Sequence, residues 1–312
     1  MSNTVAAQSV FLTLVRSARE RSRARLLIDS IRSFGGAMSD CPIWLFEADP
    51  AQAPCASLAG AGVKVLPLNV PDAMRRYDFG DKVYACAQAE AMAAGVQSLI
   101  WADPGVLFIQ PPRLYDLGAS FDAAVRPVHI KNVGLLATEP LDGFWQKVYQ
   151  TVGVQDISVT VDSFVDTQHL RAYFNSHAFA VHPSAGLLRQ WLECFEVLVG
   201  DQAFQSACCE DERHQIFLHQ AVLSALIAAR LDPQRVRTSV PPAYNYPYNL
   251  HSSIPQERRA QALDDLVCVA YEDRSLDPAA MNDIAVHDPL RSWLSVHLVK
   301  AEQPDALPAE SK

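Results

Sequence analysis

The chain has 312 residues, of which 49% are hydrophobic and 20% are charged, so it can bury a large core and is too apolar for an intrinsically disordered chain. Its formal net charge of −9 argues against a protein that binds duplex nucleic acid, which needs clustered Lys and Arg. Small anionic ligands are compatible with this charge, because a few local cations and helix N-termini suffice to bind them.

Short apolar runs alternate with amphipathic segments in the first half of the chain, which is typical of βαβ units around a parallel sheet. The expected order is a strand at 10–15, a helix at 22–34, strands at 42–47 and 62–70, a helix at 82–94 and a strand at 97–102. The second half is less regular. Its expected elements are strands at 123–128 and 174–181, helices at 141–149, 184–199 and 212–230, a strand-rich insertion at 151–167 and a proline-fixed loop at 241–249.

No internal repeat or linker divides the chain, so a single α/β domain over residues 1–300 is expected, followed by a disordered tail at 301–312. The seven cysteines are odd in number and form no C-x-x-C, which argues against a disulfide framework and a zinc ribbon. The first ten residues lack the layout of a signal peptide, and no apolar run reaches the roughly 20 residues that span a bilayer. A cytoplasmic protein without a transmembrane segment is therefore expected. The P-loop and nucleophile-elbow motifs are also absent, which weakens the common ATPase and hydrolase interpretations.

The most informative segment is L-I-W-A-D-P-G-V-L-F at 99–108, where an apolar strand delivers Asp103 to its carboxyl end. Open α/β sheets bind ligands at that end of their strands. Asp103 also favours the first position of a Pro-Gly turn, so these residues alone support a structural and a functional role equally.

In context, this segment resembles the D-x-D strand of GT-A glycosyltransferases, especially the family-eight-like bacterial enzymes. In that family the two carboxylates hold the metal that bridges the donor diphosphate. Here Asp103 stands at the first position and Gly105 replaces the second carboxylate. The resemblance covers most of residues 10–295 as an ordered set of weak motifs. It implies a GT-A (Rossmann-like) α/β fold with a mixed central sheet flanked by helices, a nucleotide-binding half at about 8–135 and an acceptor half at about 136–300.

The resemblance also implies donor-binding residues. Thr13 and Arg16 would face the nucleotide, and Lys82 would meet the donor phosphates. The segment 126–129 resembles the strand that lines the sugar pocket, 173–177 resembles the family's Asn-containing acceptor strand, and 284–287 resembles its C-terminal His segment. The residues that these segments would contribute are Arg126, His129, Asn175 and His287.

The missing second carboxylate bears on metal binding, because Mg²⁺ and Mn²⁺ need several hard oxygen ligands. Asp103 and His287 could still hold Mn²⁺ or Mg²⁺ weakly with waters. Alternatively, Arg and Lys could neutralise the leaving diphosphate without a metal. A third alternative is that donor binding has been lost.

Two catalytic assignments compete near the helix at 212–230. Asp211 resembles the carboxylate of inverting GT-A enzymes that acts as a base and deprotonates the acceptor hydroxyl. Acidic residues at the start of a helix, however, are commonly caps. His219-Gln220 stands where retaining relatives carry an Asp-Gln pair beneath the anomeric carbon. Gln220 lies on the apolar stripe of this helix, so its amide needs a partner, either structural or a ligand. Inversion and retention both remain open.

The sequence thus predicts a glycosyltransferase that moves a sugar from a nucleoside diphosphate, with UDP as the expected nucleotide, to an unidentified acceptor. One alternative is a GT-A-shaped binding or partner protein that does not catalyse. Another is an unrelated α/β enzyme, which a failure of Asp103, Gln220 and His287 to share one pocket would favour.

Overall fold

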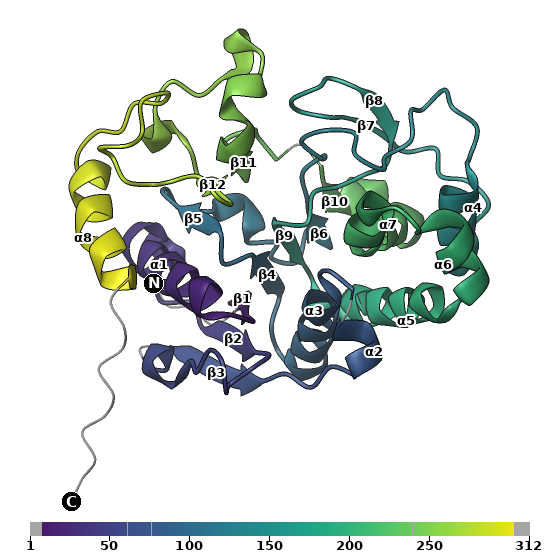
Figure 1. The fold of residues 1–312 in the computed structure, drawn as a ribbon, viewed down its shortest axis with the longest axis horizontal. Coiled ribbons are helices and arrows are strands. Elements are labelled where there is room, and N and C mark those ends of the chain that lie inside the picture. Colours follow the sequence, from purple (N-terminus) through teal and green to yellow (C-terminus); the bar gives the residue numbers. More distant parts are fainter. Residues whose placement is uncertain (1–7, 61, 76, 239, 303–312) are drawn as a thin grey trace, which may run out of the picture.

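The computed structural model describes residues 8–60, 62–75, 77–238 and 240–302, and its centre is a seven-stranded mixed sheet (Figure 1). The strand order is β10-β6-β9-β4-β1-β2-β3. In chain order the bounds are β1 (Ser9–Val15), β2 (Ile43–Glu47), β3 (Val63–Pro67), β4 (Ser98–Ala102), β6 (Ala123–Ala124), β9 (Ala178–Val181) and β10 (Val236–Arg237). Strands β1 to β4 run parallel, whereas β9 pairs antiparallel with both β4 and β6.

The central strands β1 and β4 are buried along their whole length because helices cover both faces of the sheet. Every residue of β1 is buried, and side chains alternate between two cores. Leu12 and Leu14 point to one core, and Phe11 and Val15 point to the other. The expected strands at 10–15, 42–47 and 97–102 each agree with the structure to within one residue at either end.

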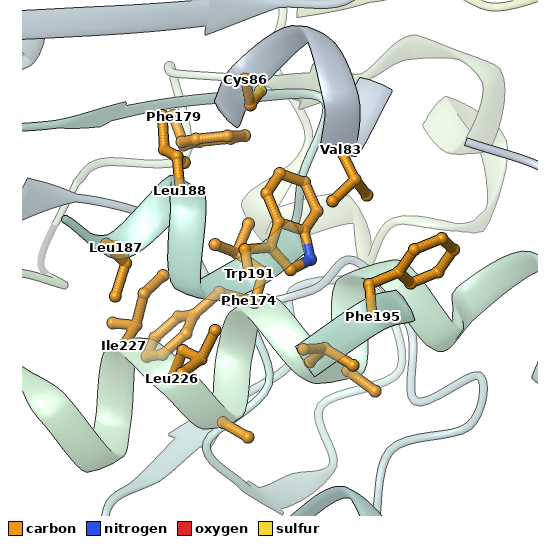
Figure 2. Close-up of a cluster of buried hydrophobic side chains, with 14 of the residues drawn as sticks. Val83, Cys86, Phe174, Phe179, Leu187, Leu188, Trp191, Phe195, Leu226 and Ile227 are labelled. Carbon is orange, nitrogen blue, oxygen red and sulfur yellow. The ribbon is translucent and has the colours of Figure 1, made fainter. Parts of the chain in front are cut away.

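Helix α1 (Ala18–Phe34) covers one face of the sheet, and α3 (Gly80–Met92), α5 (Leu187–Gly200) and α7 (Glu212–Arg230) cover the other. Figure 2 shows part of the core that contains Leu12 and Leu14, in which Trp191 of α5 lies among side chains from α3, α7 and β9. The remaining helices are α2 (Asp72–Arg75), α4 (Gly143–Thr151), α6 (Gln202–Cys208) and α8 (Leu290–Glu302). None of the helices in the described part of the chain is long and apolar enough to cross a membrane.

Several expectations for the second half need correction. The strands expected at 123–128 and 174–181 shrink to β6 and β9, because the chain leaves the sheet after Ala124 and joins it only at Ala178. The expected insertion contains one hairpin, in which β7 (Thr160–Asp162) pairs with β8 (His169–Arg171). The disordered tail expected from residue 301 does not begin there, since α8 continues to Glu302 and buries Ala301. Residues 303–312 lie outside the described part.

A small three-stranded sheet joins the C-terminal segment to the middle of the chain. Strand β5 (Val106–Phe108) pairs antiparallel with β12 (Cys268–Ala270), which pairs in turn with β11 (Tyr246–Pro247). Strand β11 lies inside the loop expected at 241–249. Because β5 directly follows the Asp103 turn, this sheet brings residues 268–273 beside the carboxyl end of β4.

Candidate active site

A cavity of about 480 Å³ opens at the carboxyl ends of β1 and β4, the edge at which open α/β sheets bind ligands. Its walls come from both expected halves of the chain. The polar and charged lining residues are Arg16, Glu20, Arg23, Lys82, Asp103, His129, Asn132, Asn175, His177, Gln220, Asn249, Glu272 and Asp273.

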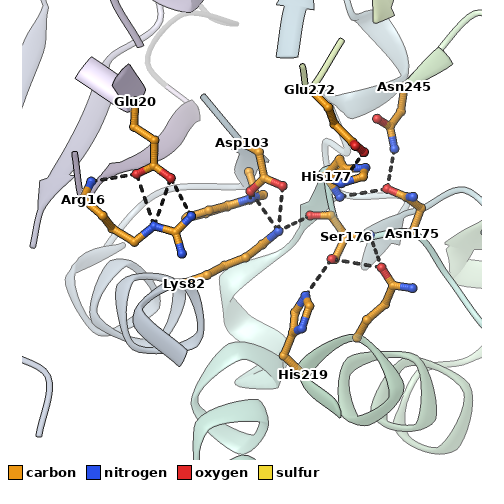
Figure 3. Close-up of polar contacts among 12 residues, drawn as sticks. Arg16, Glu20, Lys82, Asp103, Asn175, Ser176, His177, His219, Asn245 and Glu272 are labelled. Atoms are coloured by element: carbon orange, nitrogen blue, oxygen red, sulfur yellow. Dashed lines mark hydrogen bonds and ion pairs between the residues drawn. The ribbon is translucent and has the colours of Figure 1, made fainter. Parts of the chain in front are cut away.

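Lys82 and Asp103 form a buried ion pair in this cavity (Figure 3). The Lys82 Nζ atom lies 2.9 Å from Oδ1 and 3.2 Å from Oδ2 of Asp103, and it also donates to the Ser176 carbonyl oxygen. The Trp101 indole donates to Oδ1 of Asp103 at 2.7 Å. Lys82 is only 1% exposed, and burial lowers its pKa while the neighbouring Asp103 carboxylate opposes that shift.

Ser176 connects this pair to helix α7. Its hydroxyl lies 3.0 Å from Nε2 of His219 and 3.1 Å from Oε1 of Gln220, and its backbone N–H donates to the same Oε1 at 3.2 Å. Nδ1 of His219 lies 2.8 Å from the Ile216 carbonyl oxygen, so Nδ1 carries the proton and Nε2 accepts. Burial, and then the nearby Lys82 charge, hold the pKa of His219 well below 6.5, so its ring is neutral at pH 7.

The β1–α1 connection provides a second ion pair. The Arg16 guanidinium donates to the Glu20 carboxylate, with Nε 3.0 Å from Oε1, and the Arg16 backbone N–H donates to Oε2. The Arg16 guanidinium also lies 5.7 Å from the centre of the Phe79 ring. Phe79 has a left-handed backbone, with φ 63°, and its ring stacks on His219 at 4.5 Å. A non-glycine residue held at positive φ is uncommon, and here it places an aromatic ring between the arginine and the histidine.

The opposite wall carries polar atoms without protein partners. His129 is 6% exposed, and neither of its ring nitrogens makes a hydrogen bond within the described residues. Burial holds the pKa of His129 well below 6.5, with smaller contributions from Arg126 and His177. Nδ1 of His177 and Oδ1 of Asn249 are likewise buried without a partner in the described part of the chain. Buried polar atoms are nearly always satisfied, so this wall is suited to a polar ligand.

Asn175 has its side-chain oxygen engaged on the same wall. That oxygen accepts from Nδ2 of Asn245 at 2.6 Å and from the backbone N–H of His177 at 2.8 Å. Six of the residues expected from the sequence therefore line one cavity, and His219 lies directly beneath it. The six are Arg16, Lys82, Asp103, His129, Asn175 and Gln220.

Besides His219, four expected site residues lie outside the cavity lining. Thr13 points to the α1 side of the sheet, since it alternates with Leu12 and Leu14 along β1. Arg126 is buried, and its Nη1 donates to the carbonyl oxygens of Pro242 and Tyr244, so it anchors the proline loop. Burial lowers the pKa of Arg126 to about 10.

Asp211 and His287 are the other two. Asp211 caps helix α7 by accepting the His214 backbone N–H at 3.0 Å, and its side chain is 58% exposed. His287 is 66% exposed and pairs with Asp264 at 3.2 Å. The expected metal pair of Asp103 and His287 is therefore not assembled, because only Asp103 reaches the cavity.

Comparison with known proteins now identifies the family. The family model of the Rhodobacterales glycosyltransferase domain matches residues 11–231. The chain belongs to this glycosyltransferase family. Comparison with curated proteins gives no significant match.

Solved structures show that this transferase has a GT-A-like fold. The galactosyltransferase LgtC, solved in complex with donor and acceptor sugar analogues, matches with a TM-score of 0.53 and 13% identity. An active-site mutant of LgtC matches with a TM-score of 0.54 and 11% identity. Each alignment covers 97% of this chain and 98% of the LgtC chain, so the likeness in fold extends beyond the region that the family model matches.

The candidate site also contains residues that the sequence did not indicate. Ser176 connects the Lys82–Asp103 pair to Gln220 on α7, but nothing in the sequence around it indicated a functional role. Glu20 stands four residues after Arg16 at the start of a helix, a spacing that predicts an ion pair. Glu272 and Asp273 enter the cavity only because β12 pairs with β5, and nothing in the sequence indicated that register.

The side chains that line the cavity are not arranged as ligands for a divalent cation. Among the residues that the structure describes, no group of three or more His, Cys, Asp or Glu side chains is arranged to hold a metal ion. Both carboxylate oxygens of Asp103 are engaged by Lys82, and Gly105 has no side-chain oxygen to offer. Mg²⁺ and Mn²⁺ need several free hard oxygens, which this strand end does not supply.

Proposed function

We propose that this enzyme transfers a sugar from a nucleoside diphosphate, with UDP as the nucleotide, to an acceptor in the manner of the family-eight-like transferases. One observation carries the proposal. Asp103, Lys82, Ser176 and Gln220, which come from four separate segments, form a continuous bonded network at a cavity beside the carboxyl ends of β1 and β4. We further propose a cytoplasmic bacterial location and no nucleic-acid partner, in keeping with the net charge of −9.

The two ends of the cavity suit the two substrates. The end beside α1 carries Arg16 and Arg23, and positive side chains stabilise the charge that develops on a leaving diphosphate. Asp103 and Gln220 lie between the ends, where their oxygen and amide groups suit sugar hydroxyls. The far end carries His177, whose partly exposed imidazole suits the hydroxyl groups of an acceptor.

His219 has a positioning role in this proposal. It lies under the cavity floor, and its Nε2 is engaged by the Ser176 hydroxyl, so it does not reach a substrate. Its neutral ring accepts the Ser176 hydroxyl and so fixes Ser176, whose backbone N–H in turn donates to the Gln220 amide oxygen.

The first test is calorimetric titration of the protein with UDP and UDP-sugars. We expect micromolar binding, and we expect Arg16→Ala to weaken it at least about tenfold because Arg16 faces the cavity. Arg291→Ala is the matched control, since Arg291 is exposed on α8 and lies outside the cavity lining. Absence of binding to any nucleotide, or equal weakening by both variants, would contradict the proposal.

A further inference from the structure

The cation position at the end of β4 is filled by the protein itself. In the family that the sequence resembles, a metal meets the aspartates at this strand end. Here Lys82 Nζ contacts both oxygens of Asp103, and Trp101 Nε1 donates to one of them. The carboxylate therefore already has a positive partner and two donors.

Lys82 is held firmly in this position. Its ammonium carries three hydrogens, and the contacts to Asp103 and to the Ser176 carbonyl oxygen use them. The rings of Trp101 and Phe79 lie 5.1 Å and 5.6 Å from Nζ and add cation–π attraction. A metal that bound Asp103 would displace a buried ammonium from its only carboxylate partner within the described residues, which is strongly unfavourable.

The neighbouring positions offer no replacement ligands. Gly105 lacks a side-chain oxygen, although a Cβ atom there would meet nothing closer than 3.8 Å. The backbone nitrogen of Glu272 would lie only 3.8 Å from a Cβ atom on Gly105, but the Glu272 carboxylate is turned to the His177 ring, at 3.6 Å. His287, the expected second ligand, is outside the cavity and pairs with Asp264.

We infer that this glycosyltransferase binds its donor without a divalent cation, with the Lys82 ammonium occupying the position of the metal beside Asp103. The inference rests on the proposed function for the identity of the donor. Positive charge toward the diphosphate then comes from Arg16 and Arg23 at the α1 end of the cavity, together with Lys82.

The test measures Mn²⁺ binding directly, by the loss of the free Mn²⁺ signal in electron paramagnetic resonance. The wild-type protein without nucleotide should show no site tighter than millimolar, and with UDP it should lower the free Mn²⁺ signal no further than the same concentration of UDP alone. Gly105→Asp adds the missing carboxylate in a position with room for it, and Lys82→Met frees Asp103. We expect the Lys82→Met/Gly105→Asp double variant to bind Mn²⁺ at least tenfold more tightly than Gly105→Asp alone. Gly105→Asn with Lys82→Met is the matched control without the added charge, and thermal melts check that each variant folds.

Three results would overturn the inference. The first is micromolar Mn²⁺ binding by the wild type that Asp103→Asn abolishes. The second is an increase of tenfold or more in UDP affinity when Mn²⁺ replaces EDTA. The third is equal Mn²⁺ affinity in the double variant and in Gly105→Asp, which would show that Lys82 does not block Asp103. The proposed function fails separately, through the absence of UDP binding under both conditions, and the Mn²⁺ titrations are informative in either case.

Discussion

Replacing Ser176 with alanine tests the network that connects the Lys82–Asp103 pair to His219 and Gln220 on α7. The change removes the hydroxyl that lies 3.0 Å from Nε2 of His219, and it leaves that buried nitrogen without a donor. An unsatisfied buried acceptor costs about 1–3 kcal/mol, so we expect the free energy of unfolding to fall by about that amount. Gln220 accepts the backbone N–H of Ser176, and loss of the hydroxyl bond to His219 frees Ser176 to shift, so the Gln220 amide becomes less well placed.

Misplacement of a site residue by a fraction of an ångström to 1 Å lowers turnover by up to about 100-fold, and we expect kcat of Ser176→Ala to fall by about 10- to 100-fold. Urea denaturation measures the first effect, and sugar release from the donor measures the second. Ser30→Ala is the matched control. Ser30 is equally buried, donates to the Leu27 carbonyl oxygen and accepts the Phe108 N–H, but it lies away from the cavity. Equal loss of turnover in the two variants, or full turnover in Ser176→Ala, would refute the role assigned to Ser176.

Two further predictions concern charge and capping. His129 and His219 have folded-state pKa values held below the unfolded value of about 6.5, so the unfolded state binds more protons below that pH. The full free energy of unfolding should therefore be present above pH 6.5. Below that pH it should fall by up to about 1.4 kcal/mol per pH unit for each ring, and the slope should be smaller in His129→Asn. A urea-denaturation profile that is flat from pH 7.5 to 5.5 would contradict this. Asp211→Ala should lower the free energy of unfolding by about 1 kcal/mol through loss of the α7 cap and leave kcat unchanged. A tenfold fall in kcat with the helix intact would instead support Asp211 as the catalytic base.

The sheet was predictable because its central strands are continuous apolar runs. Strands β1 and β4 are buried on both sides, so their composition alone marks them. Helix α7 was also predicted with its observed bounds, since Asp211 is a standard cap and the apolar stripe continues to Arg230. The strand expected at 174–181 was too long, because Phe174 is followed by three polar residues, of which Asn175 and His177 line the cavity.

The site was less predictable because several residue types serve two purposes. Asp211 has the sequence position of both a catalytic base and a helix cap, and sequence spacing does not distinguish these two roles. Arg126 looked like a sugar ligand, but its partners are carbonyl oxygens more than 100 residues along the chain. The pairing of Lys82 with Asp103 depends on how α3 lies against β4, which is a matter of packing and not of local pattern.

The β5–β12 pairing has a consequence for how the protein is made. Residues 249–273 supply one wall of the cavity, and they follow the region at 11–231 that the family model matches. A ribosome releases the sheet strands β1 to β4 first, and these can pack with their helices while the rest of the chain is still being synthesised. The turn at Asp103 then stays open on one side until Cys268–Ala270 emerges and pairs with Val106–Phe108. The cavity is thus completed only after residues 268–273 emerge, and a nascent chain stalled before residue 268 would hold the seven-stranded sheet but an incomplete cavity.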